Sequence, residues 1–171
     1  MVKLTKSFTF FVAVSVFAIV VSGLYLGGEK HAHAEIVIAA PAADVWRVIA
    51  DAPAYKQWNP IFVPVSGTFG VGNTLRSQVT SADGEISERE SLVVRFAREK
   101  VLNQYGGWPL IFTFNHSIQL VPDAAGVRVI QHTEYRGVGV WLWDVKPMMD
   151  AYEAVNRALQ ARVLDEVTKR S

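Results

Sequence analysis

The 171-residue chain contains no cysteine, few charged residues and almost no excess of charge of either sign. The absence of cysteine excludes disulfide bonds, thiolate nucleophiles, cysteine-ligated zinc and iron–sulfur clusters. Charged residues make up 19% of the chain, and the formal net charge is +1. This balance argues against a nucleic acid as partner, because binding phosphates needs an excess of Lys and Arg on one face.

Sequence motifs for common cofactors and catalytic centres are also missing. The chain has no P-loop, no glycine-rich dinucleotide fingerprint, no serine nucleophile elbow and no H-E-x-x-H motif. His31 and His33 form an H-x-H pair, which makes a poor zinc site without a third ligand. The sequence therefore predicts no metal, no cofactor and no catalytic residue that a motif identifies.

Hydrophobic residues are plentiful, at 50% of the chain, which excludes a disordered protein. An uncharged hydrophobic run, Phe8 to Leu26, would form roughly 28 Å of helix at about 1.5 Å per residue. That length is close to the bilayer's hydrocarbon core of about 30 Å. Lys3 and Lys6 precede the run, and this positive-inside bias would leave the N-terminus in the cytoplasm and the rest of the chain outside.

The sequence thus predicts three parts. Residues 1–27 are expected to be a signal anchor, a single transmembrane helix in the cell membrane. Residues 28–34 are expected to be a linker, and 35–171 one domain outside the cytoplasm, since about 150 residues make a typical domain.

A cleavable signal peptide is the competing interpretation of the N-terminus. Ala32-His33-Ala34 has the A-x-A form of a cleavage site, which would make Glu35 the first residue of a secreted or periplasmic protein. A buried core helix is the third possibility. The signal anchor and the cleaved signal peptide would both place the domain outside the cytoplasm.

The exported part begins with a short strand and two short helices. Residues 34–39 are typical of a strand, and Pro41 suits the first turn of a helix of about ten residues. Pro53 opens a second helical turn, which Asn59-Pro60 ends.

Hydrophobic side chains then alternate with polar ones as far as Arg136, as expected for β-strands. Short turns separate them, which favours an antiparallel meander. The expected strands cover about 62–69, 74–80, 85–96, 100–107, 111–121 and 127–136.

The last hairpin predicts its own register. Residues 123–126 form a four-residue turn, which pairs Pro122 with Val127. A shift of one residue would mix apolar and polar side chains on both faces. The predicted register puts the following residues on one mostly apolar face: Phe112, Phe114, His116, Ile118, Leu120, Val129, Gln131, Thr133 and Tyr135.

A long amphipathic helix is expected from about Lys146 onward. Its apolar stripe must lie across the apolar face of the one-sided sheet. The stripe consists of Met148, Tyr152, Val155, Leu159, Val163 and Val167.

These elements and several motifs resemble the helix-grip fold of the SRPBCC superfamily, which includes START, Bet v 1-like and polyketide cyclase/dehydrase proteins. The similar segments are Ile36–Ala42 with Val45-Trp46, Trp58-Asn59-Pro60, His116–Pro122 and Thr133–Gly137. The resemblance covers about 35–168. It implies an α+β fold in which a curved antiparallel sheet wraps around the long C-terminal helix, with a hydrophobic cavity between them.

The resemblance implies a function only broadly, because fold does not imply function. Members bind lipids, sterols, quinones, polyketides or plant hormones, or serve as enzymes or chaperone cofactors, and share no catalytic motif. We expect an exported, membrane-tethered protein that binds a small hydrophobic ligand such as a lipid, an isoprenoid or a polyketide-like molecule. The alternatives are a polyketide cyclase/dehydratase-like enzyme with His116 as general base, or a protein-interaction domain without a ligand.

A few polar groups in an apolar pocket would fix the orientation of such a ligand. A neutral His116 imidazole could bind a ligand carbonyl or act as a base, or it could simply bond to a neighbouring strand. The residues expected to line the cavity or its mouth are Trp58, Phe112, Phe114, His116, Gln131, Thr133, Tyr135, Trp141, Met148 and Tyr152.

Overall fold

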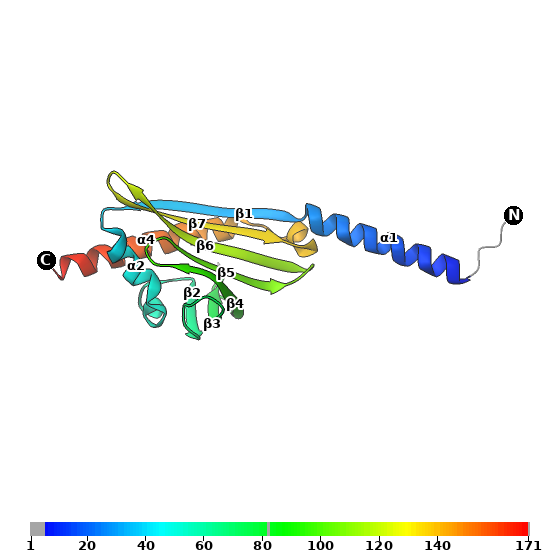
Figure 1. The fold of residues 1–171 in the computed structure, drawn as a ribbon, viewed down its shortest axis with the longest axis horizontal. Helices are drawn as coiled ribbons and strands as arrows, with labels where there is room; N and C mark the ends of the chain where they lie inside the picture. The colour runs from blue at the N-terminus through cyan, green and yellow to red at the C-terminus, as the bar shows by residue number, and fades with distance from the viewer. Residues whose placement is uncertain (1–5, 82, 171) are drawn as a thin grey trace.

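The computed structural model describes residues 6–81 and 83–170 (Figure 1). Its core is a seven-stranded antiparallel sheet in the order β1-β7-β6-β5-β4-β3-β2. The strands are β1 (Glu29–Ile38), β2 (Phe62–Ser66), β3 (Thr74–Thr80), β4 (Ile86–Ala97), β5 (Val101–Trp108), β6 (Phe112–Asp123) and β7 (Gly126–Arg136).

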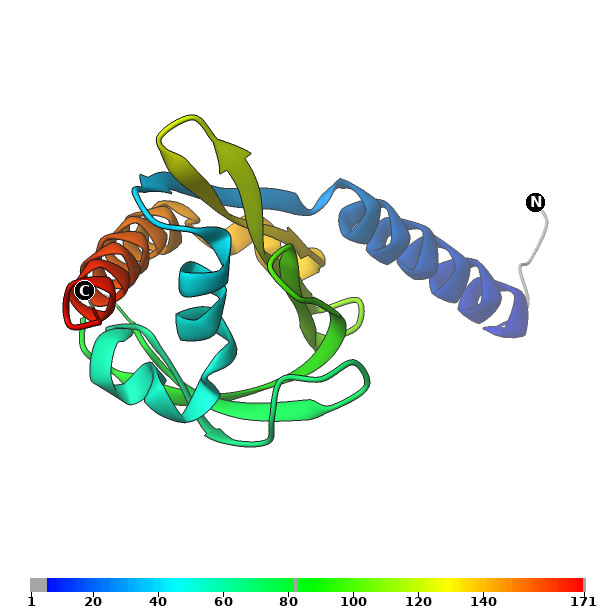
Figure 2. The same ribbon diagram turned by 60° about the vertical axis from the view of Figure 1, so that its left-hand side comes forward.

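Helices α2 and α4 lie on the concave side of this sheet, while α1 extends away from it (Figure 1). The sheet bends into an arc, α4 closes its open side, and α2 lies within the arc (Figure 2). This arrangement confirms the predicted curved sheet around a C-terminal helix. The helical segments are α1 (Lys6–Gly27), α2 (Ala42–Ala50), η1 (Ala52–Ala54), α3 (Tyr55–Trp58), η2 (Val138–Leu142) and α4 (Lys146–Thr168).

The β6–β7 hairpin has the predicted register, with Pro122 opposite Val127. Side chains of β7 alternate between buried and half-exposed along most of its length. The stripe of α4 faces the sheet as predicted, and Val155, Leu159 and Val163 are buried in it. Register and helix placement therefore follow from hydrophobic periodicity alone.

Strand β1 begins at Glu29, so the prediction of a linker over 28–34 is wrong. Every residue from Glu29 to Ile38 pairs with β7, and only Gly28 separates β1 from α1. Ala32 and Ala34 face inward and are buried, while His31 and His33 are exposed. Buried and exposed side chains alternate along the segment as in a strand, although its polar composition is typical of a linker. The A-x-A motif is thus the middle of a paired strand.

The described apolar side chains of helix α1 are largely exposed to solvent. Phe11, Phe17 and Ile19 are 65–71% exposed. Even so, none of the helices within the described residues combines the length and hydropathy that a bilayer crossing requires. The predicted transmembrane helix is therefore unsupported by the structure, and Lys3 lies outside the described residues.

A β-bulge interrupts β4 between Val93 and Arg95. The extra residue reverses the alternation of side chains that follows it. Arg95 lies opposite Asn103 on the outer face, and Phe96 turns inward, where its ring centroid lies 5.2 Å from that of Trp46.

Gly137 lets η2 approach the β5–β6 turn closely. Its φ is +134°, and a Cβ at this position would lie 2.3 Å from the carbonyl oxygen of Ile111. Its amide donates to the carbonyl of Gly28, at 3.0 Å, and so ties the end of β7 to the junction of α1 and β1.

Gly137→Ala should therefore destabilise the protein by roughly 3 kcal/mol, because backbone strain of about 1–3 kcal/mol is added to a clash with backbone atoms. Gly84→Ala is the matched control, since Gly84 has φ +85° but open space around it. It should cost only about 1–2 kcal/mol. Urea unfolding measures both, and equal losses would contradict the proposed clash at Ile111.

Candidate ligand-binding site

Four polar side chains cross the concave face of the sheet as a row, which we call the polar row: Ser91, Gln104, His116 and Thr133. The register places Gln104 opposite His116 and His116 opposite Thr133. Ser91 Oγ donates to Gln104 Oε1 at 2.8 Å. Ser91, Gln104 and Thr133 are buried and His116 is half-buried. An apolar face therefore contains one continuous polar stripe.

Thr133 connects this row to α4. Its hydroxyl oxygen lies 2.8 Å from His116 Nδ1 and 2.5 Å from the Tyr152 hydroxyl. The Tyr152 hydroxyl in turn lies 3.2 Å from that of Tyr135. The ring centroids of His116 and Tyr152 are 5.2 Å apart. Sheet and helix thus share one chain of hydrogen bonds.

The polar row separates two apolar clusters. The larger cluster lies toward α2 and includes Ile118, Leu120 and Leu159. The smaller cluster lies toward α1, and Tyr135 and Tyr152 belong to it. Six half-buried side chains pack against the smaller cluster: Phe112, Phe114, Trp143, Val145, Met148 and Met149.

The groups of this network are neutral near pH 7. Burial, with a smaller contribution from nearby His132, lowers the pKa of His116 to about 4. Burial also raises the pKa of Tyr135 and of Tyr152. A neutral imidazole has one donor and one acceptor nitrogen. No described residue forms a hydrogen bond with His116 Nε2. This nitrogen is a donor if Nδ1 accepts from Thr133, and an acceptor if Nδ1 donates to it.

A second polar pair lies next to this network. Gln131 Nε2 donates to Asn156 Oδ1 at 2.7 Å, and both side chains are buried. Asn156 Nδ2 is buried with no partner among the described residues. The sequence analysis missed Asn156, although it follows Tyr152 by one helical turn and so shares its face.

A pocket of about 230 Å³ opens at the seam between β1 and α4, and we call it the seam pocket. Ala34, Glu35 and Ile36 line it from the strand, and Glu153, Asn156 and Arg157 from the helix. The seam pocket therefore reaches the buried amide next to the polar row.

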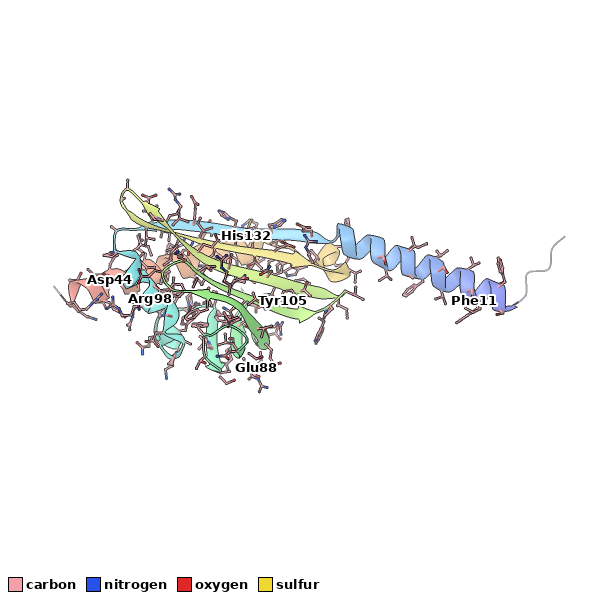
Figure 3. All side chains as sticks on the ribbon, viewed as in Figure 1. Phe11, Asp44, Glu88, Arg98, Tyr105 and His132 are labelled. Carbon is pink, nitrogen blue, oxygen red and sulfur yellow. The ribbon has the colours of Figure 1, made fainter. Side chains whose placement is uncertain are left out.

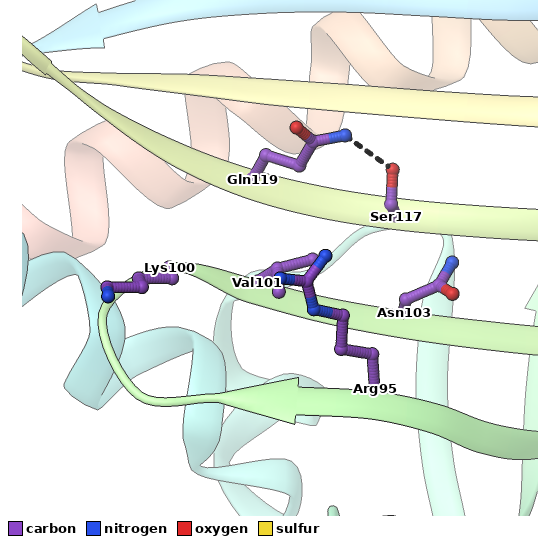
Figure 4. Close-up of a pocket in the computed structure, with 6 residues that line it drawn as sticks. All are labelled: Arg95, Lys100, Val101, Asn103, Ser117 and Gln119. Carbon is purple, nitrogen blue, oxygen red and sulfur yellow. Dashed lines mark hydrogen bonds between the residues drawn. The ribbon is translucent and has the colours of Figure 1, made fainter.

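A second pocket, of about 300 Å³, lies on the outer face of the sheet (Figure 4). It is lined by Arg95, Lys100, Val101, Asn103, Ser117 and Gln119. Asn103 donates to the carbonyl of His116, so the sheet itself separates this pocket from the polar row.

The structure brings together most of the residues predicted to bind a ligand: Phe112, Phe114, His116, Gln131, Thr133, Tyr135, Met148 and Tyr152 lie in or beside the network. Two others lie apart. Trp58 packs against the larger cluster, and Trp141 is 55% exposed on η2. Whether these residues bind a ligand remains a prediction.

Trp143 is a member of the site that the prediction left out. Its ring centroid lies 4.5 Å from that of Tyr135 and 5.3 Å from that of Phe112. Lys30 donates to its carbonyl oxygen. Trp143 directly follows the short helix η2, which is too short for a periodicity to indicate which way the side chain points.

A curved antiparallel sheet that grips one long helix, with a polar row between the two, defines a helix-grip protein. Residues 29–170 match the model of the family described as polyketide cyclase / dehydrase and lipid transport, and the chain belongs to this family. The match starts at residue 29, where β1 begins. No curated protein matches the chain significantly.

Solved structures show the same fold at low sequence identity. Protein NE0264 from Nitrosomonas europaea has a TM-score of 0.64 at 14% identity, covering 81% of this chain and 96% of its own. The di-domain ARO/CYC StfQ from the steffimycin biosynthetic pathway has a TM-score of 0.68 at 9% identity, covering 82% of this chain and 52% of its own. The di-domain ARO/CYC BexL from the BE-7585A biosynthetic pathway has a TM-score of 0.66 at 14% identity, covering 88% of this chain and 59% of its own.

The low pKa of His116 predicts a pH-dependent stability. The unfolded chain protonates this residue near pH 6.5, well above the folded value of about 4. The unfolded state therefore binds more protons between these values, so stability falls as pH is lowered from about 6.5 to about 4. The expected loss is on the order of 2 kcal/mol.

Urea unfolding at several pH values measures this loss, and NMR titration measures the pKa of His116 directly. His116→Gln is the control, since it cannot titrate and should show a smaller loss over the same range. A titration of His116 near pH 6.5 in the folded protein would contradict the burial of its ring.

Proposed function

We propose that the protein binds a small apolar molecule carrying an oxygen acceptor, held beside the polar row. The observation that carries this proposal is the buried Asn156 Nδ2, which has no hydrogen-bond partner among the described residues and belongs to a side chain that lines the seam pocket. A buried donor without a partner costs about 1–3 kcal/mol. A carbonyl or hydroxyl oxygen of a ligand would remove that cost.

The size of the site limits the ligand. The seam pocket, at about 230 Å³, is smaller than the roughly 300–1,000 Å³ of pockets for drug-sized molecules. It suits a single ring or the polar head of a longer molecule. A longer apolar chain would displace the half-buried side chains of the smaller cluster, where Met148 and Met149 can adapt their shape. Lipids, isoprenoids and polyketide-like molecules all combine an oxygen-containing group with an apolar part.

A binding function fits the electrostatics better than catalysis does. A general base works best with a pKa near the working pH. The pKa of His116, at about 4, makes its imidazole a weak base but a suitable neutral hydrogen-bonding group. The names of the ARO/CYC neighbours make a cyclase/dehydratase activity the second candidate. It would require that His116→Ala abolish turnover of a substrate.

We also propose that the domain lies outside the cytoplasm and is held at a membrane by residues 1–27. Lys3 and Lys6 before the apolar run support this orientation. The pairing of β1 supports retention of the segment, because cleavage after Ala34 would remove Glu29–Ala34 from a strand paired along its whole length.

Ligand binding is tested by mass spectrometry of solvent extracts from the full chain purified in detergent. The wild type should yield an apolar, oxygen-containing molecule, and Asn156→Leu should yield several-fold less, because the donor that holds its oxygen is gone. His132→Gln is the matched control, since His132 lies beside Thr133 on β7 but faces the outer side (Figure 3). Equal extracts from all three proteins would contradict the site, and a wild type free of any such molecule would favour an interaction domain.

Retention of the N-terminus is tested by the intact mass of the protein isolated from membranes. We expect Glu29–Ala34 to remain. Deleting residues 1–34 should destabilise the domain by at least about 2 kcal/mol through lost strand hydrogen bonds, each worth about 0.5–1.5 kcal/mol net. Deleting residues 1–27 should have a much smaller effect. A mature protein that begins at Glu35 would refute the prediction.

A further inference from the structure

Two loops at one end of the molecule expose large apolar side chains to solvent. The β5–β6 turn carries Trp108, Leu110 and Ile111, which are 73%, 54% and 53% exposed. Beside it, Leu142 at the end of η2 is 95% exposed. We call these four residues the apolar end.

Backbone hydrogen bonds tie the two loops into one surface. The amide of Val138 donates to the carbonyl of Leu110 at 3.0 Å, and the amide of Gly139 donates to that of Ile111 at 2.9 Å. The backbones of the two loops are therefore held against each other. Helix α1 leaves the domain at this same end and contacts η2 (Figure 1).

Charged side chains border the apolar end at the ends of β1 and β7, where Glu29, Lys30 and Arg136 lie, but are absent from its loops. The segments that build the apolar end, Tyr105–Gln119 and Gly137–Trp143, contain no Asp, Glu, Lys or Arg. At the opposite end, Asp44 and Arg98 are labelled near the C-terminal part of α4 (Figure 3). Lys169 and Arg170 lie there as well, at the end of that helix.

We propose that the apolar end docks on the surface of a lipid bilayer, with Trp108 and Leu142 among the lipid headgroups and upper acyl chains. Helix α1 joins the domain at this end, and its apolar side chains from Phe8 to Val20 are exposed as well (Figure 1). The apolar end consists of projecting loop tips, which enter a lipid surface more readily than they fit the flat face of a second copy. Tryptophan suits this boundary, because its ring is apolar and its N–H is polar. The proposal rests on the proposed attachment of residues 1–27 to a membrane and not on whether the seam pocket binds a ligand.

The absence of cysteine makes a direct test possible. Leu142→Cys is labelled with the fluorophore nitrobenzoxadiazole in the full chain, reconstituted in vesicles of phosphatidylcholine and phosphatidylglycerol. The emission should shift to the blue, and nitroxide-labelled lipids should quench it. Iodide in the aqueous phase should quench the label on the vesicles several-fold less than it quenches the free dye in water. The same label at Leu164→Cys, on the distant part of α4, should show the reverse pattern.

A second variant separates docking of the domain from attachment through α1. Trp108→Glu should move the label at position 142 into water while the protein stays on the vesicles. Val71→Glu is its control, since Val71 is 65% exposed in the β2–β3 connection, and it should leave the label in lipid. A label at 142 that iodide quenches as strongly as the label at 164 would overturn the proposal. So would lipid quenching at both positions, or no response to Trp108→Glu.

Discussion

The hydroxyl of Thr133 is the polar contact on which the arrangement of sheet and helix depends. It lies within hydrogen-bond distance of both His116 on β6 and Tyr152 on α4. Beside it, Gln131 and Asn156 form a second hydrogen bond between the sheet and α4. A buried group that loses its partner costs about 1–3 kcal/mol, so the chain of hydrogen bonds selects one position for the helix. The same chain keeps polar atoms between the two apolar clusters, where a ligand's oxygen can meet them.

Hydrophobic periodicity was sufficient to predict most of the fold. The pairing of Pro122 with Val127 followed from the alternation on both strands and the turn between them. The placement of α4 followed from its apolar stripe. The first half of β1 was missed because Ala32 and Ala34 are small and their neighbours are charged or histidine. Pairing with β7, a contact distant in sequence, makes this segment a strand.

The candidate site was only partly predictable. Side chains of β6 and β7 were assigned to the correct face because strand geometry determines the face. Trp58 and Trp141 were grouped with them because they lie next to predicted junctions with the sheet, and the structure separates them from the polar row. Asn156 and the seam pocket depend on how α4 packs against the edge of β1, which no local pattern of the sequence records.

The one-residue connection at Gly28 couples the N-terminal helix mechanically to the domain. A hinge needs several residues whose backbone torsions can change freely. Here a single residue is available, and its carbonyl is already bound by the amide of Gly137. The point at which α1 leaves the domain is therefore bound to the end of β7, so a force on α1 is passed first to β1 and β7, two strands that contact α4.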